Sequence, residues 1–280
     1  DATVVLIDAA APEPFHFDEL ASDSRVQVRV GDVADKKFID GVFAQCAARK
    51  QVSWFAFSAP SDDDGTERGQ RMHTCIDGCI NILESARVHG DVAGLRCRVV
   101  LVTDDATRRA APSTYSATAS CLELILADFV RRGAVDGCAA RIPVVLGSPR
   151  SPGFTDAFAR LVYTSLAGRP CAVPVAADAE RSLASPRCVA DALLALHDAP
   201  AVSAALLVVA VPGVVVSACE LHAAMQRVAV GVQAATYGGA ATASAATPRA
   251  VCACSTRRLG TAAPSSSDSS AAISAAPSVL

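Results

Sequence analysis

Three segments near the start of the chain place small or acidic residues at the ends of apolar runs. They are Asp8 at the end of the run 3–8, Gly31-Asp32-Val33 within 26–35, and Ser58-Ala59-Pro60 at the end of 52–60. An acid at the tip of a buried parallel strand can accept hydrogen bonds from ribose hydroxyls, and small residues let a pyrophosphate pass close to the backbone. These segments indicate a dinucleotide site. The alternative is that the acid at the strand end occurs by chance and that the small residues form plain turns.

Other chemistry-bearing groups give weaker signals. Cys75 and Cys79 lie one turn apart in a helical segment, and Cys252 and Cys254 lie in the last part of the chain. They lack the paired CxxC or histidine spacing of a zinc site, so we expect core thiols and no metal. Lysine occurs only at positions 36, 37 and 50. No residue beyond Lys50 can therefore act as an amine base.

The elements that position these residues alternate along the chain as strands and helices with short connections. After the first runs, we expect helices over 37–49, 68–89, 115–132, 154–168 and 186–197, and strands over 97–105, 138–147, 172–175 and 205–211. Continuous apolar strands between helices are typical of a parallel sheet covered on both faces. The fold class is therefore α/β, a Rossmann-type doubly wound parallel sheet.

Composition excludes several classes of protein. The chain has 280 residues, 51% of them hydrophobic, and a formal net charge of −3. This length can bury a large core, and the near-neutral charge argues against nucleic acid as a partner. The eleven cysteines are too sparse for a disulfide scaffold, so we expect free thiols in an intracellular reducing compartment, either the cytoplasm or the mitochondrial matrix.

One uncharged stretch, 199–219, has a borderline length for a membrane span. Pro212-Gly213 interrupts it, and Ser217 to Glu220 has the pattern of a helix-capping box. We therefore expect a strand, a turn and a helix there, and no membrane span.

Three longer segments make the pattern specific. They are YSATASCLELILADFVRRGAVDG (115–137), VPVAADAERSLASPR (173–187) and CSTRRLG (254–260). Together with the strand ends, they resemble the extended short-chain dehydrogenase/reductase family, in its sugar-acid dehydrogenase and nucleoside-diphosphate-sugar epimerase branches. The resemblance implies NAD as the cofactor, with Asp8, Asp32, Val33, Ser58, Ala59 and Pro143 along the cofactor. It also places Arg181 and Arg187 near the substrate.

The resemblance implies that Tyr115 is the acid/base of hydride transfer, but two companion positions depart from the family pattern. Ala119 stands where the family has the lysine that lowers the tyrosine pKa, which is ordinarily near 10. The family Ser/Thr position aligns with Asp104. Thr103 fits only if the register slips by one residue, which moves it to the other face of the strand.

A third departure concerns the start of the fold. The family opens with a strand and a Gly-rich turn that cradles the pyrophosphate, whereas the run 3–8 matches the second strand. That first strand is central in the doubly wound order, so its place lies between the runs 3–8 and 52–60. We expect residues upstream of Asp1 or another segment to supply it.

We expect three regions. A dinucleotide-binding domain covers 1–147, and a mixed remainder of the sheet and a small C-terminal substrate lobe cover 148–233. An Ala/Ser-rich tail over 234–280 is poorly ordered or wraps a partner.

The departures favour a catalytically impaired protein that serves as an accessory or structural subunit of a larger, possibly mitochondrial, assembly. Its partners would be other protein subunits and not a small-molecule substrate. The alternative is an active NAD(P)-dependent oxidoreductase or epimerase acting on a sugar acid or nucleotide sugar.

Overall fold

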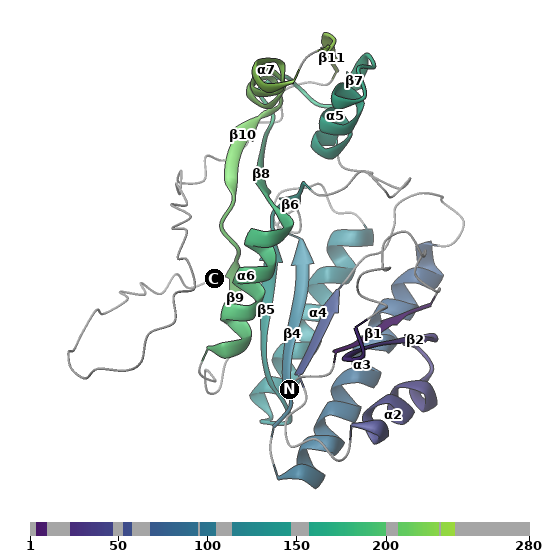
Figure 1. Cartoon of the computed structure of the whole chain (residues 1–280). Helices are drawn as coiled ribbons and strands as arrows, with labels where there is room; N and C mark the ends of the chain where they lie inside the picture. The colour runs from purple at the N-terminus through teal and green to yellow at the C-terminus, as the bar shows by residue number, and fades with distance from the viewer. Residues whose placement is uncertain are drawn as a thin grey trace, which may run out of the picture.

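A four-stranded parallel sheet forms the centre of the molecule in the computed structural model, which describes residues 4–9, 23–46, 53–57, 68–94, 96–104, 114–146, 157–199, 207–229 and 231–238. Its order is β3-β4-β5-β9 (Figure 1). The strands are β3 (Ser53–Phe57), β4 (Arg98–Asp104), β5 (Asp136–Ile142) and β9 (Leu207–Ala210). The parallel α/β fold predicted from the sequence is confirmed.

Helices cover both faces of this sheet. Val99 and Leu101 of β4 pack with α3 (Arg68–Ala93) and α4 (Thr114–Arg131). Val100 and Val102, which alternate with them, pack against α6 (Pro186–Asp198). Side chains alternate between the faces of a strand, so β4 contributes to two separate cores and needs apolar residues at nearly every position.

A second parallel pair holds the first two strands of the chain. β1 (Val4–Asp8) pairs with β2 (Val26–Val30), and α2 (Lys36–Gln45) follows them. Within the described residues, neither strand is hydrogen-bonded to β3. The further strand predicted between β1 and β3 stays a prediction.

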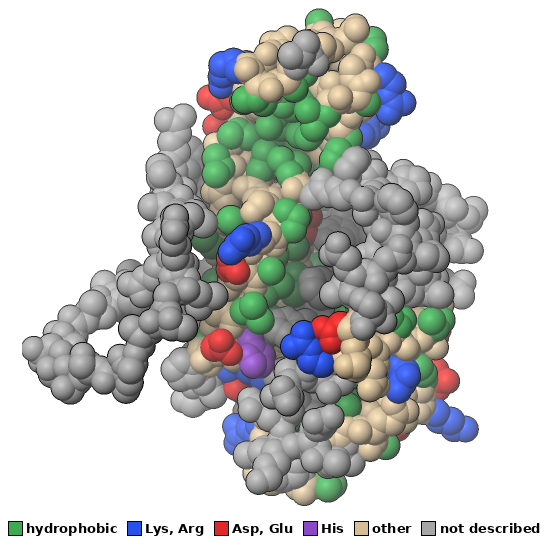
Figure 2. Space-filling model, viewed as in Figure 1, with side chains coloured by type: hydrophobic (Ala, Val, Ile, Leu, Met, Phe, Trp, Pro, Cys, Tyr) green, Lys and Arg blue, Asp and Glu red, His purple; other side chains and the backbone are tan. Residues whose placement is uncertain are grey.

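The lobe consists of two small sheets and two helices. β6 (Val144–Val145), β8 (Glu180–Ala184) and β10 (Val214–Ser217) form one sheet, and β7 (Cys171–Val173) pairs with β11 (Ala235–Tyr237). α5 (Ala157–Leu166) contributes Phe158 and Leu161 to its core, and α7 (Ala218–Val228) contributes Ala218. Figure 2 shows hydrophobic side chains gathered over β8 and β10, where Val214 is 60% exposed.

Several sequence predictions are corrected. The strand expected over 138–147 breaks at Pro143, so β5 stays in the main sheet while β6 joins the lobe. β8 and β10 were not expected, and β11 occupies the start of the predicted tail. Residues 239–280 lie outside the described part of the chain.

The uncharged stretch 199–219 supplies β9, a turn, β10 and the start of α7. The predicted capping box is confirmed, because the Ser217 side chain accepts from the Glu220 backbone N–H and Glu220 accepts from that of Ser217. No helix in the described ranges is long and apolar enough to cross a membrane.

We predict that Gly78→Ala destabilises the fold by about 1–3 kcal/mol, the usual penalty of overpacking. A Cβ at Gly78 of α3 would lie 2.5 Å from Val33 Cγ2. At Gly41 of α2 a Cβ meets no atom within 4 Å. Gly41→Ala should therefore stabilise the protein by up to about 1 kcal/mol through helix propensity. Urea unfolding of both variants measures the difference, and equal midpoints would contradict the close packing of Val33 against α3.

Candidate functional site

The first candidate region lies at the carboxyl ends of β1 and β2. Asp8 is in register with Val30, and the Gly31 backbone N–H donates to the Asp8 carbonyl oxygen at 3.0 Å. The exposed Asp8 side chain and the turn Gly31-Asp32-Val33 therefore lie side by side at one edge. The structure therefore places the turn beside Asp8, although the two are far apart in the sequence. A nucleoside site at this edge requires that arrangement.

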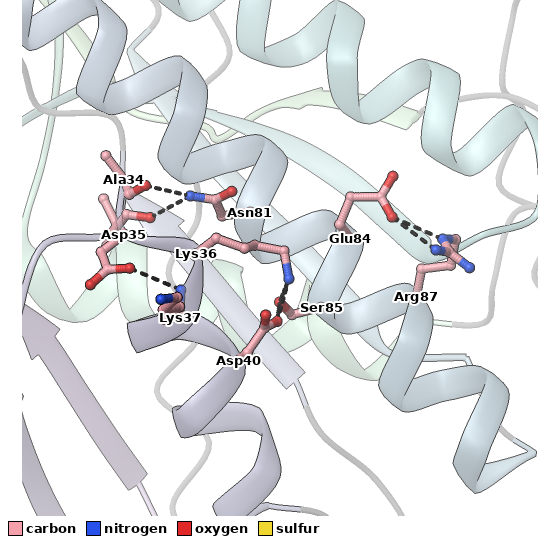
Figure 3. Close-up of polar contacts among 10 residues, drawn as sticks. Ala34, Asp35, Lys36, Lys37, Asp40, Asn81, Glu84, Ser85 and Arg87 are labelled. Atoms are coloured by element: carbon pink, nitrogen blue, oxygen red, sulfur yellow. Dashed lines mark hydrogen bonds and ion pairs between the residues drawn. The ribbon is translucent and has the colours of Figure 1, made fainter.

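Helix α3 holds this turn in place. Asn81 Nδ2 donates to the carbonyl oxygens of Val33 at 3.1 Å and Ala34 at 2.8 Å. The Asp32 carboxylate accepts from the Ala34 backbone N–H at 2.9 Å, and Asp35 caps α2. Figure 3 shows Asn81 reaching across from α3. The turn is thus preorganised by a side chain that sequence reasoning did not single out.

A second contact between α2 and α3 lies below the turn. Lys36 of α2 pairs with Asp40, and both contact the Ser85 hydroxyl of α3 (Figure 3). Hydrogen bonds from Lys36 and Ser85 hold the pKa of Asp40 below its usual value. Together with Asn81, this contact fixes α2 and the turn before it against the main domain.

The second candidate region lies at the carboxyl ends of β4 and β5. Thr103 is 2% exposed and donates its hydroxyl to Glu123 Oε1 of α4 at 2.9 Å. It therefore faces α4, on the same side of β4 as Val99 and Leu101. Asp104 is the half-buried last residue of β4, and the alternation of the strand places it on the other face.

Sequence reasoning missed the charged pair below this strand end. Arg141 of β5 donates to Glu123 through Nε at 2.9 Å and through Nη2 at 2.6 Å. The signal was available in the sequence, because Glu123 and Arg141 are single charges within the apolar segments CLELILA and CAARIPVV. Charged residues in such segments are buried only when paired.

The structure describes some of the remaining predicted site residues and not others. Tyr115 lies in the first turn of α4, and its side chain lies outside the described residues. Ala119, one turn further, is fully buried. Pro143 is buried between β5 and β6, where a Cβ at Gly213 would lie 3.1 Å from the Pro143 Cβ. Ser58 and Ala59 lie outside the described residues.

The arginines predicted near the substrate lie in the lobe and on α6. The Arg181 guanidinium of β8 lies 5.9 Å from the ring centre of Phe158, which is a cation–π geometry. It is half-buried, so the ring restricts its orientation without removing it from solvent. Arg187 is highly exposed, with its Nε 3.9 Å from Asp191 on the same helix.

The described thiols show no metal or nucleophile arrangement. No group of three or more potential metal ligands occurs among the residues that the structure describes. Burial raises the pKa of Cys75, and raises that of Cys79 to about 12. Cys97 is likewise buried, with its pKa raised to about 11. These thiols remain protonated, and Cys79 and Cys97 belong to the core between the sheet and its helices.

Comparisons with known proteins agree with the sequence resemblance. No family model matches the chain. D-erythronate dehydrogenase of Cupriavidus necator is 28% identical over 239 residues, which cover 81% of this chain and 71% of that protein. This similarity agrees with the sugar-acid dehydrogenase branch that the three sequence segments resemble.

Solved structures show the same fold. The nucleoside-diphosphate-sugar epimerase of Agrobacterium tumefaciens is 21% identical and superimposes with a TM-score of 0.66 over 83% of this chain and 71% of that one. L-threonine 3-dehydrogenase of Trypanosoma brucei is 17% identical, with a TM-score of 0.68 over 85% of this chain and 75% of that one.

We predict that iodoacetamide at mildly alkaline pH modifies Cys219 at least roughly tenfold faster than Cys79 or Cys97 in the native protein, because thiolate content and access set the rate. Cys219 is exposed, whereas burial keeps the other two protonated. Mass spectrometry of tryptic peptides measures the three rates, and unfolded protein serves as the control in which they converge. Rapid native modification of Cys79 would contradict its burial.

Proposed function

We propose, from a sequence and a fold that match the extended short-chain dehydrogenase/reductase family, that this chain is an NAD-dependent oxidoreductase or epimerase acting on a sugar acid or nucleotide sugar. The observation that carries the proposal is the parallel pairing of β1 and β2, which brings Asp8 beside the turn Gly31-Asp32-Val33. An acid and an adjoining turn at the carboxyl edge of parallel strands suit an adenosine with free ribose hydroxyls.

The charge at this edge favours NAD over NADP. Asp8 is exposed at the tip of β1, where its carboxylate would accept from the ribose hydroxyls and repel a 2′-phosphate. The backbone of the turn, fixed by Asn81, supplies a rigid wall for the adenine. Little reorganisation is then needed on binding, which favours affinity.

The lobe supports an anionic substrate. Arg181 is oriented by Phe158 and keeps its guanidinium partly in solvent. A planar guanidinium suits a carboxylate or a diphosphate, which are the anionic groups of a sugar acid and a nucleotide sugar. The similarity to D-erythronate dehydrogenase makes D-erythronate the first substrate to test.

A second candidate function rests on Ala119. A methyl group, fully buried, occupies the position of the family lysine, so no ammonium at this position lowers the pKa of Tyr115. A protein of this kind would bind NAD and serve as an accessory subunit with other proteins as partners, in the cytoplasm or the mitochondrial matrix. Both functions need NAD to bind at the carboxyl ends of β1 and β2, which we call the cofactor edge. They differ in whether the protein turns a substrate over.

We predict that Asp8→Ala weakens NADH binding about tenfold, or ~1.4 kcal/mol, through loss of the ribose contacts. Asp23→Ala is the matched control, because it removes an acid at the opposite end of the same two strands, where Asp23 pairs with Arg25. Fluorescence titration of the full chain with NADH measures both. Equal affinities for wild type and Asp8→Ala, or no saturable NADH binding by the wild type, would contradict the cofactor edge.

Turnover separates the two candidate functions. With NAD and D-erythronate, we expect the wild type to form NADH, and the double variant Ala119→Lys/Asp104→Ser to form it at least about tenfold faster, because an ammonium and a hydroxyl are restored. Absorbance of NADH measures the rate, and NADH titration verifies that the variant keeps its cofactor edge. Turnover by the double variant alone would instead establish the impaired protein.

A further inference from the structure

Two largely buried ion pairs lie at opposite ends of β4 and β5. At the amino end, Arg98 Nη1 lies 2.5 Å from Asp136 Oδ2. Towards the carboxyl end, Arg141 is in register with Thr103 and pairs with Glu123. The first pair joins two strands, with Arg98 also donating to the carbonyl oxygen of Leu196 on α6. The second pair joins β5 to α4, and the Thr103 hydroxyl connects β4 to the same carboxylate.

Glu123 is the residue in which the contacts of the second pair converge. Its side chain is 9% exposed and accepts one hydrogen bond from Thr103 and two from Arg141. Those donors come from adjacent strands, so α4 cannot slide or rotate over the sheet without breaking at least one of the three. Because the two guanidinium bonds form a planar fork, the contact constrains direction as well as distance.

Helix α4 connects this contact with the proposed reaction centre. The chain leaves β4 at Asp104 and enters α4 at Thr114, so α4 begins near the carboxyl edge of the sheet and runs back along it (Figure 1). Glu123 lies eight residues after Tyr115 and four after Ala119. At 1.5 Å per residue, Tyr115 therefore stands about 12 Å further along the helix axis.

We propose that Glu123 is a positioning residue, which sets the height and rotation of Tyr115 and position 119 above the strand ends where the nicotinamide half of NAD would bind. This role rests on the proposed function. Glu123 is buried below the site and acts through α4, without contact to the cofactor. The adenosine half binds at the ends of β1 and β2, on other elements, and is independent of Glu123.

The chemistry of the pair favours a positioning role over a purely stabilising one. A buried ion pair contributes little net stability compared with apolar residues of similar volume, because desolvation offsets the attraction between the charges. It does specify geometry, since breaking it leaves an uncompensated charge. The pair at the amino end also joins an arginine to a carboxylate and is similarly buried, but the hydrogen bonds of Arg98 go to β5 and α6 and not to α4.

The test compares binding of NADH with binding of ADP-ribose, which lacks the nicotinamide. Glu123→Gln keeps the volume and can still accept from Thr103, but removes the carboxylate that pairs with Arg141. We expect this variant to bind NADH about tenfold more weakly, while its affinity for ADP-ribose changes less than about twofold. Isothermal titration calorimetry on the full chain measures both ligands.

Asp136→Asn is the matched control, since it breaks the ion pair at the other end of β4 and β5, which does not involve α4. We expect it to lower the thermal midpoint as Glu123→Gln does, and to leave the ratio of the two affinities unchanged. Arg141→Lys keeps the charge and loses the fork, so it should give an intermediate, roughly threefold loss for NADH alone. If Glu123→Gln fails to fold, Arg141→Lys tests the same ion pair.

The outcomes separate this inference from the proposed function. Wild-type protein that binds neither NADH nor ADP-ribose overturns both. Wild-type binding of both ligands, with equal losses for the two in Glu123→Gln or the same selective loss in Asp136→Asn, overturns the positioning role and leaves the cofactor site intact. A selective loss of NADH binding in Glu123→Gln and Arg141→Lys alone supports it.

Discussion

The two-residue alternation of side chains along β4 and β5 decides where most of the other elements can lie. Val99 and Leu101 face α3 and α4, while Val100 and Val102 face α6. Because each face is closed by helices, neither strand can shift by one residue without burying its charges against the wrong helix. Thr103 then falls on the α4 face, where it meets Glu123. The arrangement of the candidate site at this edge follows from that register.

The cofactor edge depends on a different kind of constraint. β1 and β2 form only a two-stranded sheet in the described residues, and a pair of strands alone has little stability. α3 compensates by side chains, since Asn81 binds the turn after β2 and Ser85 binds the charged pair on α2. Gly78 lets Val33 approach the same helix closely. One helix therefore ties the edge with the proposed adenosine site to the main sheet.

Sequence predicted the elements whose physical signal is local. β4 was expected over 97–105 and is observed over Arg98–Asp104, because an apolar strand buried on both faces has a continuous hydrophobic pattern. β8, with the sequence ERSLA, was not expected, because its half-buried polar residues lack that pattern. The partners of Glu123 could not be predicted either, since a pairing between a helix and two strands depends on how they pack. Only the presence of unexplained charges in apolar segments pointed to it.

Position 119 links the charged pair to the chemistry proposed above it. Glu123 is already matched by Arg141, so the inner face of α4 has no unpaired carboxylate below position 119. A lysine there would need the cofactor itself as its partner, whereas alanine needs none and is fully buried. The packing of this turn of α4 is therefore that of a buried alanine, and the helix does not depend on a functional amine at position 119. The positions that the proposed chemistry uses, 115 and 119, and the packing contact at 123 lie on separate turns of α4, so a change at 119 leaves the contact of Glu123 with Thr103 and Arg141 in place.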